Sequence, residues 1–309
     1  MRGVIQHRLG PPEVLVVEEL PAPEPIPTEV QVRVRAAGVN PVDLKTRQRG
    51  GLLGDPPFRV GWDVSGVVTE LGAGVTRFRV GDEVFGMPWF PREAGAYGEF
   101  VTAPSRHFAT KPAVLSHEEA GALPLAGLTA WQIVVDTLNL QSGDDLLIHG
   151  AAGGVGHLAV QIAKARGATV IATARAEQSE WLRELGADRV IDYRGARFEE
   201  EVSELDAVID LVGSYGEASL AAMRPGATLV AVPSGAAAEL SEMAKQQSKR
   251  ATGFLVEPDP CGLAGLCDLV ESGELEVEVD RVFELAEAPA AHRAAEDHHG
   301  GGKIVIRVP

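Results

Sequence analysis

The sequence predicts an α/β protein with two parts, an irregular β-barrel and a doubly wound parallel sheet. Three observations indicate this fold class. Residues 143–164 read as a strand, a glycine turn and a helix, strands and helices alternate after them, and the first hundred residues hold short strands between Gly-, Pro- and Asp-bearing turns. The length of 309 residues is enough for two domains, each with a core of its own.

The stretch from Gly143 to Lys164 carries the clearest pattern. Leu146 to Ile148 is a short apolar run typical of a buried strand, and a helix is predicted from Val155 to Lys164. Apolar residues recur in that helix at the spacing of one buried face, whereas Gln161 and Lys164 fall off it. The residues on the predicted buried face are Val155, Leu158, Ala159, Ile162 and Ala163.

The turn between this strand and helix predicts a dinucleotide-binding site. AAGGVG (residues 151–156) matches G-x-G-x-x-G with Ala151 in the first glycine place. Gly153 would let the backbone approach the phosphates, Gly156 would let helix and strand pack closely, and the free N–H groups of the helix would face the pyrophosphate. The alternative is a glycine turn that binds nothing, and the flanking strand and helix argue against it.

The wider pattern resembles the signature of quinone oxidoreductases and zeta-crystallins, the zinc-free branch of the medium-chain dehydrogenases/reductases. The residues that carry it are Gly143-Asp144, Leu147, Ala151-Ala152-Gly153-Gly154, Gly156, Gln161 and Lys164. The likeness extends from about Val30 to the C-terminus. It implies a GroES-like catalytic domain at residues 1–119 and 275–309, and a Rossmann NADP(H)-binding domain at residues 120–274.

The elements before the glycine turn are predominantly β. Val30 to Val34 alternates apolar and polar residues after a proline-rich loop, which predicts a half-buried strand. Ser116 to Glu119 has the form of a capping box, so a helix is expected to start there, to be interrupted at Pro124 and to be followed by another over 127–138. The further strand candidates are 64–68, 84–85, 97–101 and 107–110.

The elements after the turn alternate between strands and helices, which is typical of a parallel sheet. A helical stretch over 179–185 stops at Gly186. Strand-like pieces return beyond Glu274 and end at 303–307. The strand candidates between them are 169–173, 189–192, 207–211 and 228–232, with a possible sixth at 253–256.

The end of the second strand, Thr173-Ala174-Arg175, indicates the nicotinamide cofactor. Folds that prefer NAD carry an acidic residue about twenty positions past the glycines. Arg175 stands there instead, and an arginine can bind a 2′-phosphate through charge-assisted hydrogen bonds. Residues 191–194 also resemble the family stretch whose tyrosine, here Tyr193, packs by the adenosine phosphate. We therefore predict NADPH; the alternative is that Arg175 is a solvated surface charge.

Other cofactor contacts follow from the resemblance alone. Thr129 stands where a family threonine hydroxyl reaches the nicotinamide end. The remaining contacts lie in the glycine turn, at the ends of later strands and near the C-terminus. They are Ala152, Gly153, Gly154, Val155, Gly156, Val212, Gly213, Val232, Pro233, Ser234, Phe254, Leu255, Val256 and Lys303.

Residues that could hold zinc are missing from the expected places. Zinc alcohol dehydrogenases of the same superfamily carry a cysteine early in the barrel and a Gly-His-Glu motif, whereas this chain has Gly38-Val39-Asn40-Pro41 and Gly61-Trp62-Asp63 there. Its two cysteines also cannot build a four-cysteine site. His298 and His299, with His292 nearby, could be read as a metal cluster, but histidines that flank a glycine run are more typical of a solvated loop. We therefore expect no metal.

Without a Lewis acid, an electron-poor conjugated acceptor is easier to reduce than a simple ketone, because the substrate itself delocalises the charge. The resemblance places residues 40–47 beside the nicotinamide, with Asn40 as an amide donor, Asp43 beside it and Lys45 where many relatives carry a tyrosine. Lys45 in solvent and Asp43 paired with Arg47 is the alternative interpretation. Trp89, Phe90 and Trp131 are candidates for an apolar acceptor pocket.

Composition excludes several classes of partner. A net charge of −16 would repel nucleic acid and anionic lipid, and no apolar window is long enough to span a membrane. Two cysteines six residues apart fit a reducing compartment, so a cytoplasmic location is predicted. The resemblance implies a homodimer.

Taken together, these observations predict an NADPH-dependent reductase of a quinone or an α,β-unsaturated carbonyl. An enoyl-thioester or biosynthetic enone reductase and a non-catalytic NADPH-binding protein stay open as alternatives.

Overall fold

The alternating valines predicted from Val30 belong to β3 (Glu29–Val39), a central strand of a mostly antiparallel sheet. One edge of β3 pairs with β4 (Val64–Leu71). The other edge pairs first with β6 (Phe100–Pro104) and then with β15 (Lys303–Arg307), so the last strand lies against one of the first. The computed structural model describes residues 1–232, 237–297 and 301–309.

This sheet belongs to the first of two compact units, which comprises Met1–Leu128, Glu257–Glu271 and Val277–Pro309. Its valines, with aromatic residues such as Phe108, form a continuous apolar core. The other strands of the unit are β1 (Arg2–Ile5), β2 (Val16–Glu19), β5 (Glu83–Gly86), β7 (Phe108–Thr110) and β14 (Val279–Glu284).

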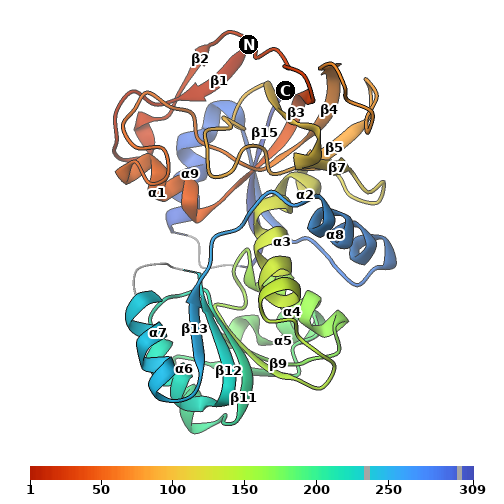
Figure 1. Cartoon of the computed structure of the whole chain (residues 1–309). Coiled ribbons are helices and arrows are strands. Elements are labelled where there is room, and N and C mark those ends of the chain that lie inside the picture. Colours follow the sequence, from red (N-terminus) through yellow and green to blue (C-terminus); the bar gives the residue numbers. More distant parts are fainter. Residues whose placement is uncertain (233–236, 298–300) are drawn as a thin grey trace. The chain divides into compact units, whose positions relative to one another are not determined.

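The helix α9 (Ala288–Glu296) packs on this sheet, and α1 (Pro41–Arg49) lies beside α9 (Figure 1). The capping box predicted at Ser116 is present and begins α2 (His117–Ala122). Pro124 then begins α3 (Pro124–Trp131), which continues as π-type turns over Gln132–Thr137. The remaining helix of the unit is α8 (Pro260–Ser272).

The second unit, Thr129–Val256 with Ser272–Glu276, contains the parallel sheet predicted from the strand and helix alternation. The strand order is β10-β9-β8-β11-β12-β13. The strands before β11 are added outward from β8 on one side, and those from β11 onward are added on the other side, as in a doubly wound sheet. The strands are β8 (Asp145–His149), β9 (Thr169–Ala174), β10 (Arg189–Asp192), β11 (Leu205–Asp210), β12 (Met223–Ala231) and β13 (Arg250–Gly253).

Helices cover both faces of this sheet: α4 and α5 lie on one side of it and α6 and α7 on the other (Figure 1). Their bounds are α4 (Gly156–Ala165), α5 (Ser179–Glu184), α6 (Gly216–Ala222) and α7 (Ala237–Gln246). The predicted α/β class, with a GroES-like unit and a Rossmann unit, is confirmed.

Three local predictions need correction. The possible sixth strand over 253–256 lies earlier, at Arg250–Gly253, because its parallel register with β12 ends where Ala231 faces Gly253. The strand expected over 97–101 begins only at Phe100, since the carbonyl of Tyr97 is taken by the Val4 N–H at 2.7 Å. Gln161, expected off the buried face of α4, is 5 % exposed, because both ends of its amide bond the backbone of Glu276.

Candidate active site

The glycine turn in the second unit has the geometry that a phosphate-binding loop requires. Gly150, in the left-handed region at φ 72°, starts the turn, and its carbonyl accepts the Gly153 N–H at 3.0 Å. A Cβ on Gly156 would lie 2.4 Å from the Gly150 oxygen and 2.6 Å from the Ala151 Cα. Only glycine therefore lets α4 begin this close to the turn.

The residues predicted to contact phosphate surround this turn. Gly153, Gly154 and Val155 are half-buried, so their backbone can still be approached, whereas Ala152 is buried. A Cβ on Gly153 would meet only the Gly150 oxygen, at 3.3 Å. The turn therefore fits a pyrophosphate, and Gly156 is the glycine on which its shape depends most.

Arg175 and Tyr193, predicted separately as 2′-phosphate contacts, meet at the carboxyl ends of β9 and β10. The Arg175 Nε donates to the Tyr193 hydroxyl at 3.1 Å. Tyr193 is exposed and Arg175 is half-buried, so the guanidinium keeps N–H groups that a phosphate can approach. Close by in the sequence, Arg194 pairs with Glu177 at 3.6 Å on the surface.

Thr173, predicted as a cofactor contact at the end of β9, lies in a buried hydrogen-bond network. It is buried, and its hydroxyl lies 3.1 Å from His149 Nδ1, while His149 Nε2 lies 3.0 Å from the Ser219 hydroxyl. The imidazole also stacks on Tyr215, with ring centroids 4.6 Å apart. Burial lowers the pKa of His149 to about 4, which the charges of Asp210 and Glu199 oppose in part. A neutral His149 therefore ties the end of β8 to the end of β9. Ala174, next to Thr173, is buried as well.

The loop after β11 is shaped by Asp210. Its carboxylate accepts the N–H of Val212 at 2.9 Å and of Gly213 at 2.8 Å, which turns these two exposed residues outward at the carboxyl end of the sheet. Gly213 has φ 88°, a value that glycine adopts without strain. Both were predicted as cofactor contacts, and they occupy the edge where open parallel sheets bind ligands.

The remaining predicted contacts of this unit vary in their exposure. Val232 follows β12 and is half-buried, and Thr129 is buried on α3. Phe254, Leu255 and Val256 follow β13 rather than form it, and Leu255 is the most exposed of the three. Pro233 and Ser234 lie outside the described residues.

In the first unit, Asn40 and Asp43 form a capping box at the start of α1. The Asn40 N–H donates to the Asp43 carboxylate at 2.8 Å, and the Gly61 N–H donates to its other oxygen at 2.9 Å. Burial raises the pKa of Asp43 to about 7; the charge of Asp63 also raises it, while the two N–H groups and Lys303 lower it. Asp43 is therefore a buried carboxyl that titrates near neutrality.

Asp63 stands where the zinc-binding relatives have the glutamate of Gly-His-Glu, and all its contacts are within the protein. One oxygen accepts the Leu125 N–H at 2.6 Å, and the other accepts the Asn40 amide at 2.7 Å and lies 3.8 Å from the Lys303 ammonium. Lys303 also donates to the Asn40 side-chain oxygen and, at 3.1 Å, to the Val39 carbonyl. Asp63 and Lys303 are both nearly inaccessible, so this ion pair is part of the interior.

The other predicted residues of the first unit do not join this cluster. Lys45 is exposed on α1. Phe90 is buried edge-on against Trp62, with ring centroids 5.5 Å apart, and the Trp89 indole donates to the Thr102 carbonyl at 2.8 Å. Trp131, at the end of α3 in the second unit, is half-buried. In the described ranges, no three His, Cys, Asp or Glu side chains gather so as to hold a metal ion.

Sequence reasoning missed that His149, Asp210 and Asp63 hold neighbouring parts of the site in place through their hydrogen bonds. A polar residue at the end of each of two buried strands, His149 on β8 and Asp210 on β11, was the available signal. For Asp63 the available signal was its place in the altered Gly-Trp-Asp motif. Lys303, predicted as a cofactor contact, lies against Asn40 and Asp63.

Comparisons with known proteins agree with this architecture. Residues 26–113 match the alcohol dehydrogenase GroES-like domain, and residues 185–306 match the family described as zinc-binding dehydrogenase. No helix in the described part of the chain combines the length and apolar character needed to cross a bilayer.

Three related proteins illustrate the match. The human NAD(P)H oxidoreductase RTN4IP1, described as mitochondrial, is 33% identical over 91% of this chain and 82% of its own. The quinone oxidoreductase of Coxiella burnetii is 39% identical, with a TM-score of 0.94 over 100% of this chain and 99% of the other. The Escherichia coli quinone oxidoreductase, solved in complex with NADPH, is 28% identical, with a TM-score of 0.87 over 99% and 100%.

These matches cover both units, and the family resemblance predicted from the glycine turn is confirmed by them. The relatives are named as oxidoreductases that use a nicotinamide cofactor, and this chain keeps the turn that such a cofactor requires. The cytoplasmic location stays a prediction. The chain belongs to the medium-chain dehydrogenase/reductase family, of the quinone oxidoreductase type, and is an NAD(P)H-dependent oxidoreductase.

Proposed function

We propose that the protein transfers a hydride from NADPH to a conjugated acceptor, a quinone or an α,β-unsaturated carbonyl compound, without zinc. The observation that carries the proposal is the environment of Asp63. Its oxygens are occupied by the Leu125 N–H, the Asn40 amide and the Lys303 ammonium, so the altered Gly-Trp-Asp motif serves an internal ion pair. A site without a Lewis acid favours acceptors that delocalise the negative charge themselves.

The hydrogen bond between Arg175 and Tyr193 supports NADPH over NADH. The guanidinium is held by the Tyr193 hydroxyl at the carboxyl end of β9, so less entropy would be lost when it binds a 2′-phosphate. The glycine turn and the first N–H groups of α4 would hold the pyrophosphate. Bound in this way, NADPH supplies the hydride.

The chain's own contribution to the reaction is then binding and charge stabilisation. We infer that Asn40 presents its remaining amide N–H to the oxygen on which negative charge develops, since Lys303 and Asp63 fix the orientation of the amide. We further propose that Lys45, exposed on α1, adds a positive charge near the acceptor or delivers the proton. Trp89, half-buried in the first unit, is proposed to contact the acceptor.

An acceptor screen tests the proposal. NADPH oxidation is followed at 340 nm with 1,4-benzoquinone, 9,10-phenanthrenequinone, a 2-enal series and an enoyl thioester. Turnover with quinones or 2-enals supports the proposal, and preference for the thioester would reassign the substrate. Saturable NADPH binding with no turnover of any acceptor would make the protein a cofactor-binding module.

We also propose a homodimer formed through the second unit. β13 is the edge strand of the sheet, and Arg250 and Thr252 point to solvent along it. An edge strand with free N–H and C=O groups can pair with a second copy. Light scattering coupled to gel filtration should give twice the 32.6 kDa chain mass, and Thr252→Pro should give the monomer.

A further inference from the structure

His157 is a fully buried histidine in the first turn of α4 that the proposed reaction does not use. Its Nδ1 lies 3.0 Å from the Gly153 carbonyl oxygen, and its backbone N–H donates to the same oxygen at 3.1 Å. The imidazole also stacks on Trp181 of α5, with ring centroids 6.0 Å apart. Because a carbonyl oxygen only accepts hydrogen bonds, Nδ1 carries a proton and donates it. One residue thus supplies two donors to one carbonyl of the glycine turn.

These two hydrogen bonds fix the peptide group that joins Gly153 to Gly154. A trans peptide is planar and points its N–H opposite to its C=O. The Gly153 C=O faces His157, so the Gly154 N–H points away from His157. Gly154 and Val155 are half-buried, and in the described part of the chain their N–H groups donate to no protein acceptor. The Gly154 N–H is therefore a directed donor that a bound anion can use.

Two glycines in a row would otherwise leave this peptide group easy to rotate. A Cβ on Gly153 would meet only the Gly150 oxygen, at 3.3 Å, so little surrounds the turn at this point. The absence of side chains lets phosphates come close, but it also removes the steric limits on the backbone. A second donor on the Gly153 carbonyl restricts the peptide before the cofactor arrives, so less entropy is lost on binding.

We propose that His157 is a positioning residue of the cofactor site: its Nδ1–H holds the Gly153 carbonyl and thereby keeps the Gly154 N–H directed at the cofactor pyrophosphate. The inference deepens the proposed function and rests on its nicotinamide cofactor, not on its acceptor. The pyrophosphate is common to NADPH and NADH, so His157 affects both cofactors alike, in contrast to Arg175.

His157→Leu tests the donor, because it replaces the ring by an apolar side chain of similar size. The Kd values for NADPH and NADH should rise by the same factor, about 2- to 12-fold, which is the effect of losing one hydrogen bond. His157→Gln should restore most of the affinity, since Gln161 of the same helix donates its amide to the carbonyl four residues back, at 3.0 Å. Unchanged Kd values in His157→Leu would overturn the proposal, and so would an equal loss in His157→Gln.

The Gly154 amide resonance reports the position of the peptide directly. It is followed in ¹⁵N-glycine-labelled protein without cofactor and is assigned with Gly154→Ala. We expect the resonance to move in His157→Leu, because the peptide is released, and to keep its place in His157→Gln. A Gly154 resonance that is the same in the native protein and in His157→Leu would show that the ring does not hold the turn.

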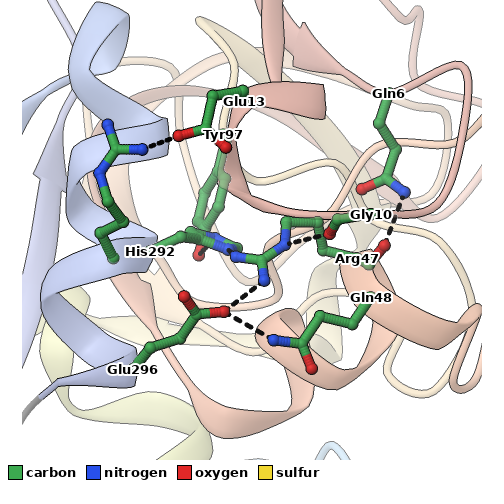
Figure 2. A network of polar contacts seen from close by, with 9 residues as sticks. Gln6, Gly10, Glu13, Arg47, Gln48, Tyr97, His292 and Glu296 are labelled. Atoms are coloured by element: carbon green, nitrogen blue, oxygen red, sulfur yellow. Dashed lines mark hydrogen bonds and ion pairs between the residues drawn. The ribbon is translucent and has the colours of Figure 1, made fainter.

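His292→Leu is the matched control, because His292 is also a fully buried histidine on a helix. Its ring nitrogens lie against the side chains of Arg47 and Tyr97 in the first unit (Figure 2). The control should lower Tm and leave both Kd values and the Gly154 resonance unchanged. An equal loss of cofactor affinity in the control would contradict the proposal, since general destabilisation would then explain both variants.

A measurement on the unmodified protein makes the test independent of folding of the variants. The ¹⁵N shifts of His157 should show a protonated Nδ1 from pH 6 to pH 8, and an unprotonated Nδ1 would contradict the hydrogen bond to Gly153. Neither NMR readout uses an acceptor. Absence of turnover in the acceptor screen would therefore refute the proposed function and leave this inference standing, whereas turnover with an unprotonated Nδ1 would refute this inference alone.

Discussion

Replacement of Arg175 by alanine should weaken NADPH binding far more than NADH binding. The guanidinium is held by the Tyr193 hydroxyl at 3.1 Å and is half-buried at the end of β9. A hydrogen bond to a charged group contributes about 1.5–3 kcal/mol, and partial exposure reduces this, so we expect a differential loss of about 1–2 kcal/mol. This corresponds to a change of about 5- to 30-fold in the ratio of the Kd for NADPH to the Kd for NADH, since about 1.4 kcal/mol equals a factor of ten.

The assay is fluorescence titration of the purified protein with NADPH and NADH at one ionic strength. The ratio of the two Kd values isolates the 2′-phosphate, because every other cofactor contact is shared. Arg183→Ala is the matched control, since Arg183 is an exposed arginine of the same unit on α5. It should change both Kd values little and equally. Equal weakening of NADPH and NADH by Arg175→Ala would refute the reasoning.

Three further predictions follow from the same geometry. Gly156→Ala should weaken NADPH at least tenfold and lower Tm, because its Cβ would lie 2.4 Å from the Gly150 oxygen, whereas Gly153→Ala, with one contact at 3.3 Å, should cost less; calorimetric titration and thermal melts compare them. His149 has a folded pKa of about 4, below the unfolded value of 6.5, so its contribution to stability is complete above pH 6.5 and is lost as the pH falls toward 4. The free energy of urea unfolding should therefore fall by about 2 kcal/mol more between pH 7 and pH 5 in the native protein than in His149→Gln. An equal pH dependence in the two proteins would contradict the neutral imidazole. Exhaustive treatment with 1,10-phenanthroline and EDTA should leave the NADPH oxidation rate unchanged, and a loss that added zinc restores would overturn the metal-free mechanism.

The parts of the fold that were predictable are those whose signal is local. The glycine turn, the helix α4 and the capping box at Ser116 depend on residues within a few positions of one another, and all three lie where the sequence placed them. The start of β6 and the bounds of β13 depend on pairing with distant strands, which no short window contains.

The candidate site divides in the same way. Arg175 was predicted from its place at the end of a strand, and Tyr193 from the resemblance of its stretch to the family. Their contact follows from neighbouring parallel strands ending at the same edge. Lys303 could not be recognised as the partner of Asp63, nor Arg47 as the partner of His292, because more than two hundred residues separate the members of each pair. A side chain's spatial neighbours are set by tertiary packing, and a single sequence does not show them.

β15 has a consequence for how the chain is made. It lies between β14 and β3, so the first unit lacks an internal strand of its sheet until residues 303–307 have left the ribosome. The second unit has all of its strands by residue 253. During synthesis, the second unit is therefore able to fold while the sheet of the first unit is still incomplete, because β15 has not yet been made.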